Sequence, residues 1–303
     1  MNQQRQGELF LLGESILWGW FPIVTLLTYR FLAPLWTMTI SIAVAGVFFG
    51  FLMFGGRRRS SRWPELRRRE AWADLAWASF YTMLLFILLF VGLAFTTAGN
   101  AALLLFFQLF FAFLYFNLLR GEAIGWAHLV GAALMGVGAI MVIFPDDLSL
   151  NKGDILVLLA AMVAPIANRY QQRARRRVHA TTLLFVRNVS SLPILLLLSC
   201  LYAPPLTMPD LAATWWLLLI NGVFLMGLSK IFWIESLHRL SITKISAMAA
   251  LSPLFTMIFA FFILNEVPRN WQLAGVLPIL VGGILITRPT KNGKLLSDCR
   301  TCH

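Results

Sequence analysis

Two charged side chains stand inside apolar stretches of the sequence. Glu14 lies in the stretch 8–27 and Lys230 in the stretch 214–236, each six residues from an end, or about 9 Å along a helix. A charge at such a depth in a membrane costs roughly 2–3 kcal/mol unless it is paired, hydrated or able to reach the interface. We therefore expect the two to face each other, or a water-filled cavity, as part of a polar gate or a site for a ligand head group. Alternatively, Lys230 reaches the interface while Glu14 bonds a neighbouring backbone or hydroxyl group, and Glu14 is also a candidate proton carrier.

Aromatic and uncharged polar residues within the apolar stretches could complete such a site. Together with Glu14 and Lys230, the predicted substrate-binding residues are Trp18, Trp20, Trp77, Tyr81, Gln108, Asn168, Ser229, Trp233 and Ser252. Aromatic faces with a few hydrogen-bonding groups suit a ligand that has an apolar side chain and a zwitterionic head. A sugar phosphate would need several inward-facing lysines or arginines. For each aromatic residue taken singly, packing against lipid or other helices is the alternative.

The elements that carry these residues are predicted to be membrane-spanning helices. Hydrophobic residues make up 59% of the 303 residues and charged residues 13%, against about 25% charged residues in soluble domains. A helix needs roughly 20 apolar residues to cross a bilayer. Ten stretches are candidates, at residues 8–27, 33–54, 71–95, 98–119, 126–144, 154–170, 181–202, 214–236, 243–264 and 271–287. The predicted fold class is an all-α polytopic membrane protein.

One segment of the chain occurs twice. Residues 122–145 and 266–289 align without a gap at an offset of 144, with identical residues at Glu122/Glu266, Leu129/Leu273, Gly131/Gly275, Val137/Val281, Gly138/Gly282, Ile140/Ile284 and Pro145/Pro289. Glycines seven apart share a helix face, and small residues allow membrane helices to pack closely. We expect the helices with Gly131/Gly138 and Gly275/Gly282 to be structural, outside any cavity. The duplication predicts two five-helix repeats, at 1–150 and 151–290, followed by a cytoplasmic tail at 291–303.

The basic residues predict the orientation. With the N-terminus in the cytoplasm, 20 of the 25 lysines and arginines fall on the inner side and three on the outer side, as the positive-inside rule requires. Five helices per repeat then place the two halves in opposite orientations, so Glu122 is inside and Glu266 outside. This topology accounts for the net charge of +12 without nucleic acid. We expect both termini in the cytoplasm.

The sequence resembles the drug/metabolite transporter superfamily, in its EamA branch. The resemblance rests on the ten stretches, the duplication and the residues Trp18-Gly19, Gly121-Glu122, Asn265-Glu266, Leu237, Ser241, Pro253 and Arg187. The first half departs from the pattern, since its second helix lacks an arginine equivalent to Arg187 and Gln108 stands where the second half has Ser252. The overall pattern is most similar to bacterial amino-acid exporters of the YddG type.

The resemblance implies a multi-pass protein of the bacterial inner membrane that works by alternating access. It further implies a central cavity lined by the first, third, fourth, sixth, eighth and ninth helices. The expected substrates are amino acids, especially aromatic or neutral ones, and related small metabolites. The alternative is an exporter of drugs or other metabolites in the same superfamily, and an intramembrane enzyme or sensor is the competing class. The oligomeric state is left open, and a monomer is consistent with the sequence.

The sequence lacks the groupings that an enzyme or a cofactor site requires. There is no phosphate-binding glycine-rich loop, no Gly-x-Ser-x-Gly and no His-Glu-x-x-His. Cys299, Cys302 and His303 spell a motif for covalent haem attachment, but this tail is predicted on the cytoplasmic side, where such attachment is not expected. We therefore expect no enzymatic activity, no cofactor and no metal.

Overall fold

The computed structural model describes residues 3–55, 63–66, 69–115, 126–143, 151–240, 251–267 and 270–286. Every regular element within these ranges is a helix. The helices of the first half are α1 (Gln3–Thr28), α2 (Pro34–Phe54), α3 (Trp63–Leu66), α4 (Arg69–Leu93), α5 (Ala98–Phe106), α6 (Gln108–Phe113) and α7 (Trp126–Ile143). Those of the second half are α8 (Lys152–Arg175), α9 (Ala180–Tyr202), α10 (Met208–Leu219), η3 (Ile220–Leu228), α11 (Ser229–Arg239), α13 (Leu251–Leu264) and α14 (Asn270–Ile286).

Each of the ten predicted stretches overlaps a described helix. In the part of the chain that the structure describes, six helical segments are long and apolar enough to cross a membrane, at Arg5–Thr28, Pro34–Phe54, Arg69–Leu93, Lys152–Arg175, Ala180–Tyr202 and Met208–Ser236. Four apolar helical segments are shorter, at Ala98–Phe113, Leu129–Gly138, Leu251–Leu264 and Leu273–Leu285. The structure is thus consistent with a polytopic membrane protein, and the count of ten spans stays a prediction.

Two predicted stretches differ from the helices in a way that matters for the site. The stretch 154–170 is part of a longer helix, α8, which continues to Arg175 because one face of its polar end packs on the protein, with Gln171 and Ala174 buried. The stretch 98–119 is interrupted at Phe107, whose backbone N–H bonds the Leu104 carbonyl and ends α5. Helix α6 then begins with Gln108.

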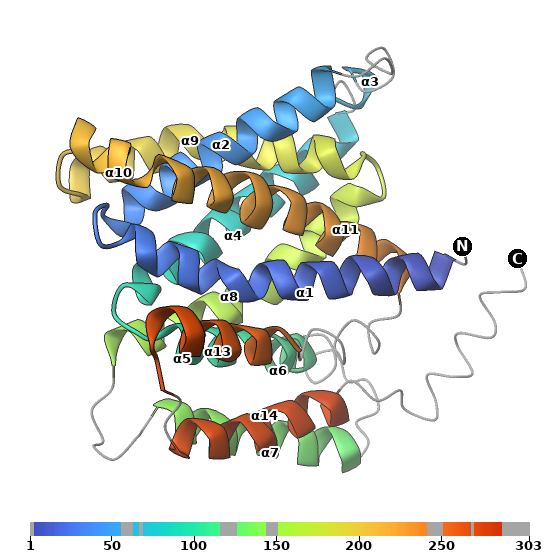
Figure 1. Ribbon diagram of the computed structural model, residues 1–303. Coiled ribbons are helices and arrows are strands. Elements are labelled where there is room, and N and C mark those ends of the chain that lie inside the picture. The colour runs from blue at the N-terminus through green and yellow to red at the C-terminus, as the bar shows by residue number, and fades with distance from the viewer. Residues whose placement is uncertain are drawn as a thin grey trace, which may run out of the picture.

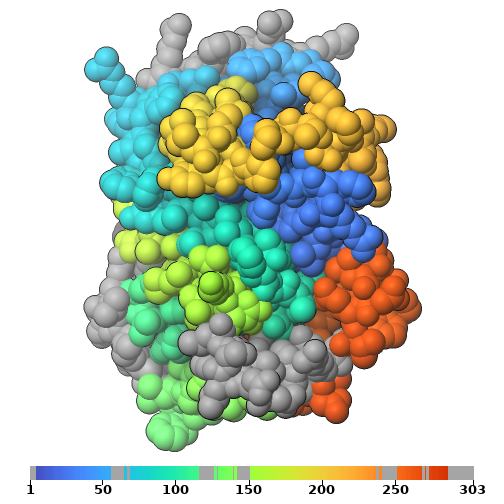
Figure 2. Space-filling model, turned by 90° about the vertical axis from the view of Figure 1, so that its left-hand side faces the viewer, coloured from blue at the N-terminus to red at the C-terminus, as the bar shows by residue number. Residues whose placement is uncertain are grey.

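Helices of the two halves pack against each other throughout the bundle (Figure 1). α2 packs on α9, and α7 packs on α14. α1 packs on α11 and α13, whereas α8 packs on α4 and on α5 and α6. When 144 is added to the residue numbers of the first half, α1 falls on α8, α4 on α10–α11, and α6 on α13. Each pairing of one half therefore has a counterpart in the other half. Seen from one end (Figure 2), surfaces of early and late residues alternate instead of forming two separate blocks.

The pairing of α7 with α14 depends on glycines. A Cβ atom on Gly138 would lie 2.5 Å from Cγ1 of Ile279 and 2.9 Å from the carbonyl oxygen of Gly275. A Cβ atom on Gly282 would lie 2.5 Å from the carbonyl oxygen of Gly131. Since real Cβ atoms do not approach other atoms so closely, only glycine fits at these two crossings. The predicted close packing of these helices is confirmed.

One long helix contains a π-helical segment. α10, η3 and α11 run on from Met208 to Arg239, and the turns of Ile220–Leu228 are π-helical. This segment lies against α2, where a Cβ atom on Gly222 would be 2.5 Å from Cβ of Val44. π-Helical turns are rare and frequently occur at functional sites. Here the segment ends just before Lys230.

The connection after α13 brings a carboxylate to the start of α5. Asn265 has a positive φ of 54°, and the backbone N–H of Glu266 bonds the Ala260 carbonyl over 3.2 Å. The Glu266 carboxylate accepts hydrogen bonds from the backbone N–H groups of Ala98 and Gly99. Burial raises the pKa of this carboxyl group, and the two N–H donors oppose that rise.

Candidate functional site

A cavity lies between the two halves and is lined by α1, α4, α5, α6, α8, α9, α11 and α13. Its walls are mostly apolar, with Trp18, Phe86 and Trp233 among the aromatic residues. The polar residues that line it are Glu14, Thr82, Gln108, Asn168, Gln171, Arg187, Lys230, Ser252 and Thr256. An apolar enclosure with a few polar groups is the usual form of a small-molecule site.

Glu14 and Lys230 lie next to each other in the wall of this cavity. The Lys230 ammonium nitrogen lies 3.7 Å from Oε1 of Glu14 and 3.2 Å from the centre of the Trp18 ring. Both charged side chains are buried, so each satisfies the other where water cannot do so fully. The predicted juxtaposition of Glu14 and Lys230 is confirmed, and the aromatic face of Trp18 adds a cation–π contact.

A second cation enters the cavity from α9. Nη1 of Arg187 donates a hydrogen bond of 3.3 Å to Oε1 of Gln171. The Gln171 amide in turn donates to Oγ1 of Thr82 over 3.3 Å. The guanidinium carbon of Arg187 lies 5.9 Å from the centre of the Phe86 ring. Residues from α9, α8 and α4 thus hold one guanidinium group in a defined orientation.

Two side-chain amides form a neutral polar contact on the same cavity. Nδ2 of Asn168 donates to Oε1 of Gln108 over 3.5 Å. Asn168 lies one helical turn before Gln171, so both face the same side of α8. Ser252 and Thr256 stand four apart on α13, and the hydroxyl of Thr256 bonds the Ser252 carbonyl over 3.1 Å.

The structure brings seven of the eleven predicted site residues to the cavity. They are Glu14, Trp18, Gln108, Asn168, Lys230, Trp233 and Ser252. They come from five helices, in both halves of the chain. Their role in binding a substrate stays a prediction.

The other four predicted site residues, Trp20, Trp77, Tyr81 and Ser229, are not among the residues that line the cavity. Trp20 packs on Phe259, with ring centres 4.7 Å apart. Ser229 is fully buried, one residue before Lys230. Adjacent residues on a helix are rotated by about 100°. A shift of one or two positions therefore turns Ser229 and Trp20 away from the face that Lys230 and Trp18 occupy.

Trp77 and Tyr81 belong to an aromatic cluster on another face of α4. Their rings lie 5.7 Å apart, and that of Tyr81 stacks 5.7 Å from Tyr170 of α8. The Trp77 side chain is 49% exposed. The cavity face of α4 carries Thr82 and Phe86 instead. The prediction that Trp77 and Tyr81 share a face is confirmed, but that face is not the cavity wall.

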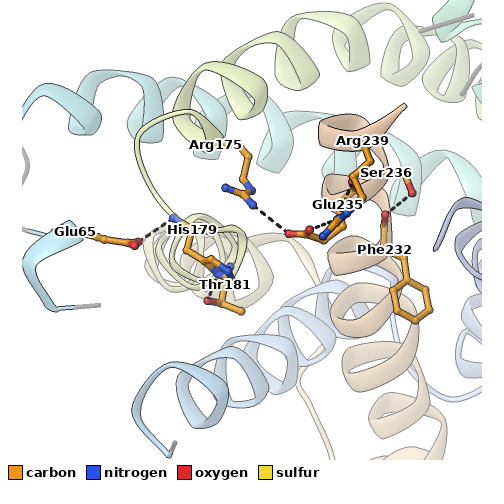
Figure 3. A network of polar contacts seen from close by, with 8 residues as sticks. All are labelled: Glu65, Arg175, His179, Thr181, Phe232, Glu235, Ser236 and Arg239. Carbon is orange, nitrogen blue, oxygen red and sulfur yellow. Dashed lines mark hydrogen bonds and ion pairs between the residues drawn. The ribbon is translucent and has the colours of Figure 1, made fainter. Parts of the chain in front are cut away.

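Polar contacts link residues of α3, α8, α9 and α11 near one end of the bundle (Figure 3). Arg175 of α8 bonds Oε1 of Glu235 over 3.2 Å, and Arg239 pairs with the other oxygen of the same carboxylate. The carboxylate of Glu65 in α3 accepts from the backbone N–H of His179 over 2.8 Å. These contacts join α3, α8, α11 and the start of α9.

A buried carboxylate strengthens the same end. Asp74 of α4 is almost fully buried and pairs with Arg173 at 3.2 Å and with Arg177 at 3.3 Å. Both arginines are partly exposed. Basic residues at the end of α8 and just after it therefore bind neighbouring helices.

The family model of EamA-like transporters matches the sequence twice, at residues 5–144 and 151–288. The chain belongs to the EamA-like transporter family. The two matches cover almost all of the chain, and the boundaries of the two repeats stay a prediction. α7 and α14 end the two matched regions, and none of their described residues lines the cavity, as expected for the glycine-packed helices.

Several relatives of this EamA-like protein are named as transporters. The chain is 23% identical to "Uncharacterized transporter YcxC" of Bacillus subtilis, with 90% of the chain and 88% of the relative covered. It is 26% identical to an "Uncharacterized transporter" of Methanothermobacter thermautotrophicus, covering 82% and 80%. The chain is 22% identical to "Uncharacterized transporter sll1164" of Synechocystis. This match covers 65% of the chain and only 60% of the relative.

A crystal structure of a protein 18% identical in sequence has the same fold, with a TM-score of 0.65. The match covers 97% of this chain and 99% of the other. The family and the relatives above are described as transporters, and the lack of an enzymatic activity stays an expectation from the sequence. In the described residues, no three His, Cys, Asp or Glu side chains are grouped as metal ligands would be. Cys299, Cys302 and His303 lie outside the described residues.

Proposed function

We propose that this EamA-like transporter exports amino acids with aromatic or other neutral side chains, and related small metabolites, across a bacterial inner membrane. The observation that carries the proposal is the cavity between the halves. There, aromatic and aliphatic walls surround the Glu14–Lys230 pair and Arg187. Apolar walls accommodate the side chain of such a substrate, and charged groups of both signs accommodate a zwitterionic head.

Transport follows alternating access between two inverted five-helix repeats, with both termini in the cytoplasm. The 20 basic residues on the inner side support this orientation. The helix pairings, which stay the same when the halves are exchanged, support two equivalent half-structures. Because the repeats are inverted, an exchange of conformation between them converts a state that is open to one side of the membrane into a state that is open to the other.

The ends of the bundle offer contacts that could hold either side shut. At the predicted cytoplasmic end, Glu235 joins Arg175 of α8 to α11. At the opposite end, the Glu266 carboxylate joins the α13–α14 connection to the start of α5. Opening toward one side breaks one set of contacts while the other set is retained.

Counterflow in liposomes tests the proposed function directly. The purified full chain is reconstituted into liposomes loaded with unlabelled L-phenylalanine, and labelled L-phenylalanine is added outside. Transient accumulation of the label above the level in protein-free liposomes is the expected result. A screen of other amino acids and of cationic drugs, with and without a pH gradient, follows in the same vesicles. Accumulation of drugs but of no amino acid would replace this proposal by drug export.

A further inference from the structure

Arg187 differs from the other charged residues of the cavity in its partners. Glu14 and Lys230 pair with each other. Arg187 is 3% exposed, and its polar partner is the neutral amide of Gln171. No carboxylate of the described residues forms an ion pair with it. A buried guanidinium without a counterion is costly, because an amide oxygen compensates only part of its lost hydration.

The lining of the cavity therefore has an excess of positive charge. Among its described residues, Arg187 and Lys230 are cationic and Glu14 is the single acid. Arg187 and Lys230 also repel each other. One anionic group is needed to balance the three side chains, and a guanidinium matches a carboxylate with two parallel hydrogen bonds.

The guanidinium group is oriented before any ligand arrives. Gln171 holds one of its nitrogens, and Thr82 holds Gln171 through a second hydrogen bond. The remaining N–H groups are available to a ligand in the cavity. A group that is already oriented loses less entropy when it binds.

We propose that Arg187 is the carboxylate subsite of the cavity and that a free carboxylate, rather than an ammonium group, is what a substrate must carry. The carboxylate of Glu14 is already paired with Lys230, whose ammonium group lies over the Trp18 ring, so a substrate ammonium is optional. The substrate class is then apolar monocarboxylic acids, of which aromatic amino acids are one kind. This inference rests on the proposed function in that it concerns the same cavity.

Three ligands of one shape separate the two head groups. L-phenylalanine has both the carboxylate and the ammonium, 3-phenylpropionate lacks the ammonium, and L-phenylalaninamide lacks the carboxylate. Binding is measured from the ligand-dependent rise in melting temperature of the purified full chain. We expect the first two to bind and the amide to bind at least roughly tenfold more weakly, the effect of losing a charge-assisted hydrogen bond.

Variants assign the effect to one side chain. Arg187→Gln should bring the affinities of phenylalanine and its amide to within about threefold, whereas Arg187→Lys should keep part of the preference. Arg30→Gln is the matched control, because Arg30 is exposed just after α1 and does not line the cavity. This control should leave the preference unchanged.

Each outcome decides the inference. Equal binding of phenylalanine and its amide to the wild-type protein overturns it and leaves amino-acid transport standing. Binding of 3-phenylpropionate without binding of phenylalanine supports the subsite and contradicts the proposed amino-acid function. Absence of binding by all three compounds overturns both. If Arg187→Gln does not fold, the wild-type comparison decides alone.

Discussion

The ammonium group of Lys230 lies 3.7 Å from the Glu14 carboxylate, although 216 positions separate the two residues in the chain. The pair joins α1 of the first half to α11 of the second at the wall of the cavity. Its two charges are buried, and a buried pair is stable only while both members are present. This relationship makes the pair sensitive both to mutation and to the opening of the cavity.

Removal of either member should be worse than removal of both. Glu14→Gln leaves Lys230 without its carboxylate, and Lys230→Met leaves Glu14 without its cation. Each should lower the free energy of unfolding by about 3 kcal/mol and reduce counterflow at least roughly tenfold. The double variant should recover part of both losses. Melting curves in detergent and counterflow rates provide the measurements.

Lys152→Met is the matched control for this pair, since Lys152 is exposed at the start of α8. It should leave counterflow and stability unchanged. Wild-type counterflow by both single variants would show that the pair has no part in transport.

The glycine crossings of α7 and α14 should be intolerant of even one methyl group. Gly138→Ala and Gly282→Ala place a Cβ atom against a backbone carbonyl oxygen, and overpacking of this kind costs about 1–3 kcal/mol. Gly136→Ala is the control on the same helix, because a Cβ atom there meets nothing within 4 Å. The first two variants should melt at lower temperature and the third should not. Equal melting temperatures for Gly136→Ala and Gly138→Ala would contradict the close crossing.

Protonation of Glu266 should affect stability in a predictable direction. Burial raises the folded-state pKa of this carboxyl group above its ordinary value of 4.5. The folded protein then binds this proton more tightly than the unfolded chain does, so protonation of Glu266 stabilises the fold. The stabilisation is full below pH 4.5 and is lost as the pH rises through the raised pKa. Glu266→Gln should remove that contribution, flattening the fall in melting temperature from pH 4.5 to pH 7. An unchanged pH profile in the variant would rule out Glu266 as its source.

The proposed orientation can be tested with cysteines at opposite ends of the helices. In a background without native cysteines, Ser60→Cys lies in the predicted cytoplasmic loop and Leu206→Cys between α9 and α10, at the predicted outer side. A membrane-impermeant thiol reagent added to intact cells should label the cysteine at 206 and spare the one at 60. The reverse pattern would contradict cytoplasmic termini.

Much of the fold was predictable because it depends on hydrophobicity and on the internal repeat, both of which can be read directly from the sequence. The ten apolar stretches mark helices, and the 144-residue repeat marks the crossing glycines of α7 and α14. The contact between Glu14 and Lys230 was predictable from depth, since two opposite charges at the same level in a membrane have few other partners. These inferences need no knowledge of which way a helix face points.

The rotation of each helix about its axis was not predictable. α1 and α4 are apolar around most of their circumference, so no polar stripe separates the face of Trp18 from that of Trp20, or the face of Thr82 from that of Tyr81. Arg187 was singled out only through the family resemblance, and its place on the cavity depends on Gln171 and Thr82, which are distant in sequence. The one available signal was the spacing of Asn168 and Gln171 on one face of α8.

The central claim is that the cavity between the halves is the transport pathway. Its most direct test is a single cysteine, Asn168→Cys, in a chain carrying Cys200→Ser, Cys299→Ser and Cys302→Ser, with Trp77→Cys as a control on the exposed aromatic face. The account predicts that a bulky thiol reagent abolishes counterflow through the first variant and not the second, and that a transported substrate slows labelling at position 168 alone. Undiminished counterflow by protein fully labelled at position 168 would contradict it.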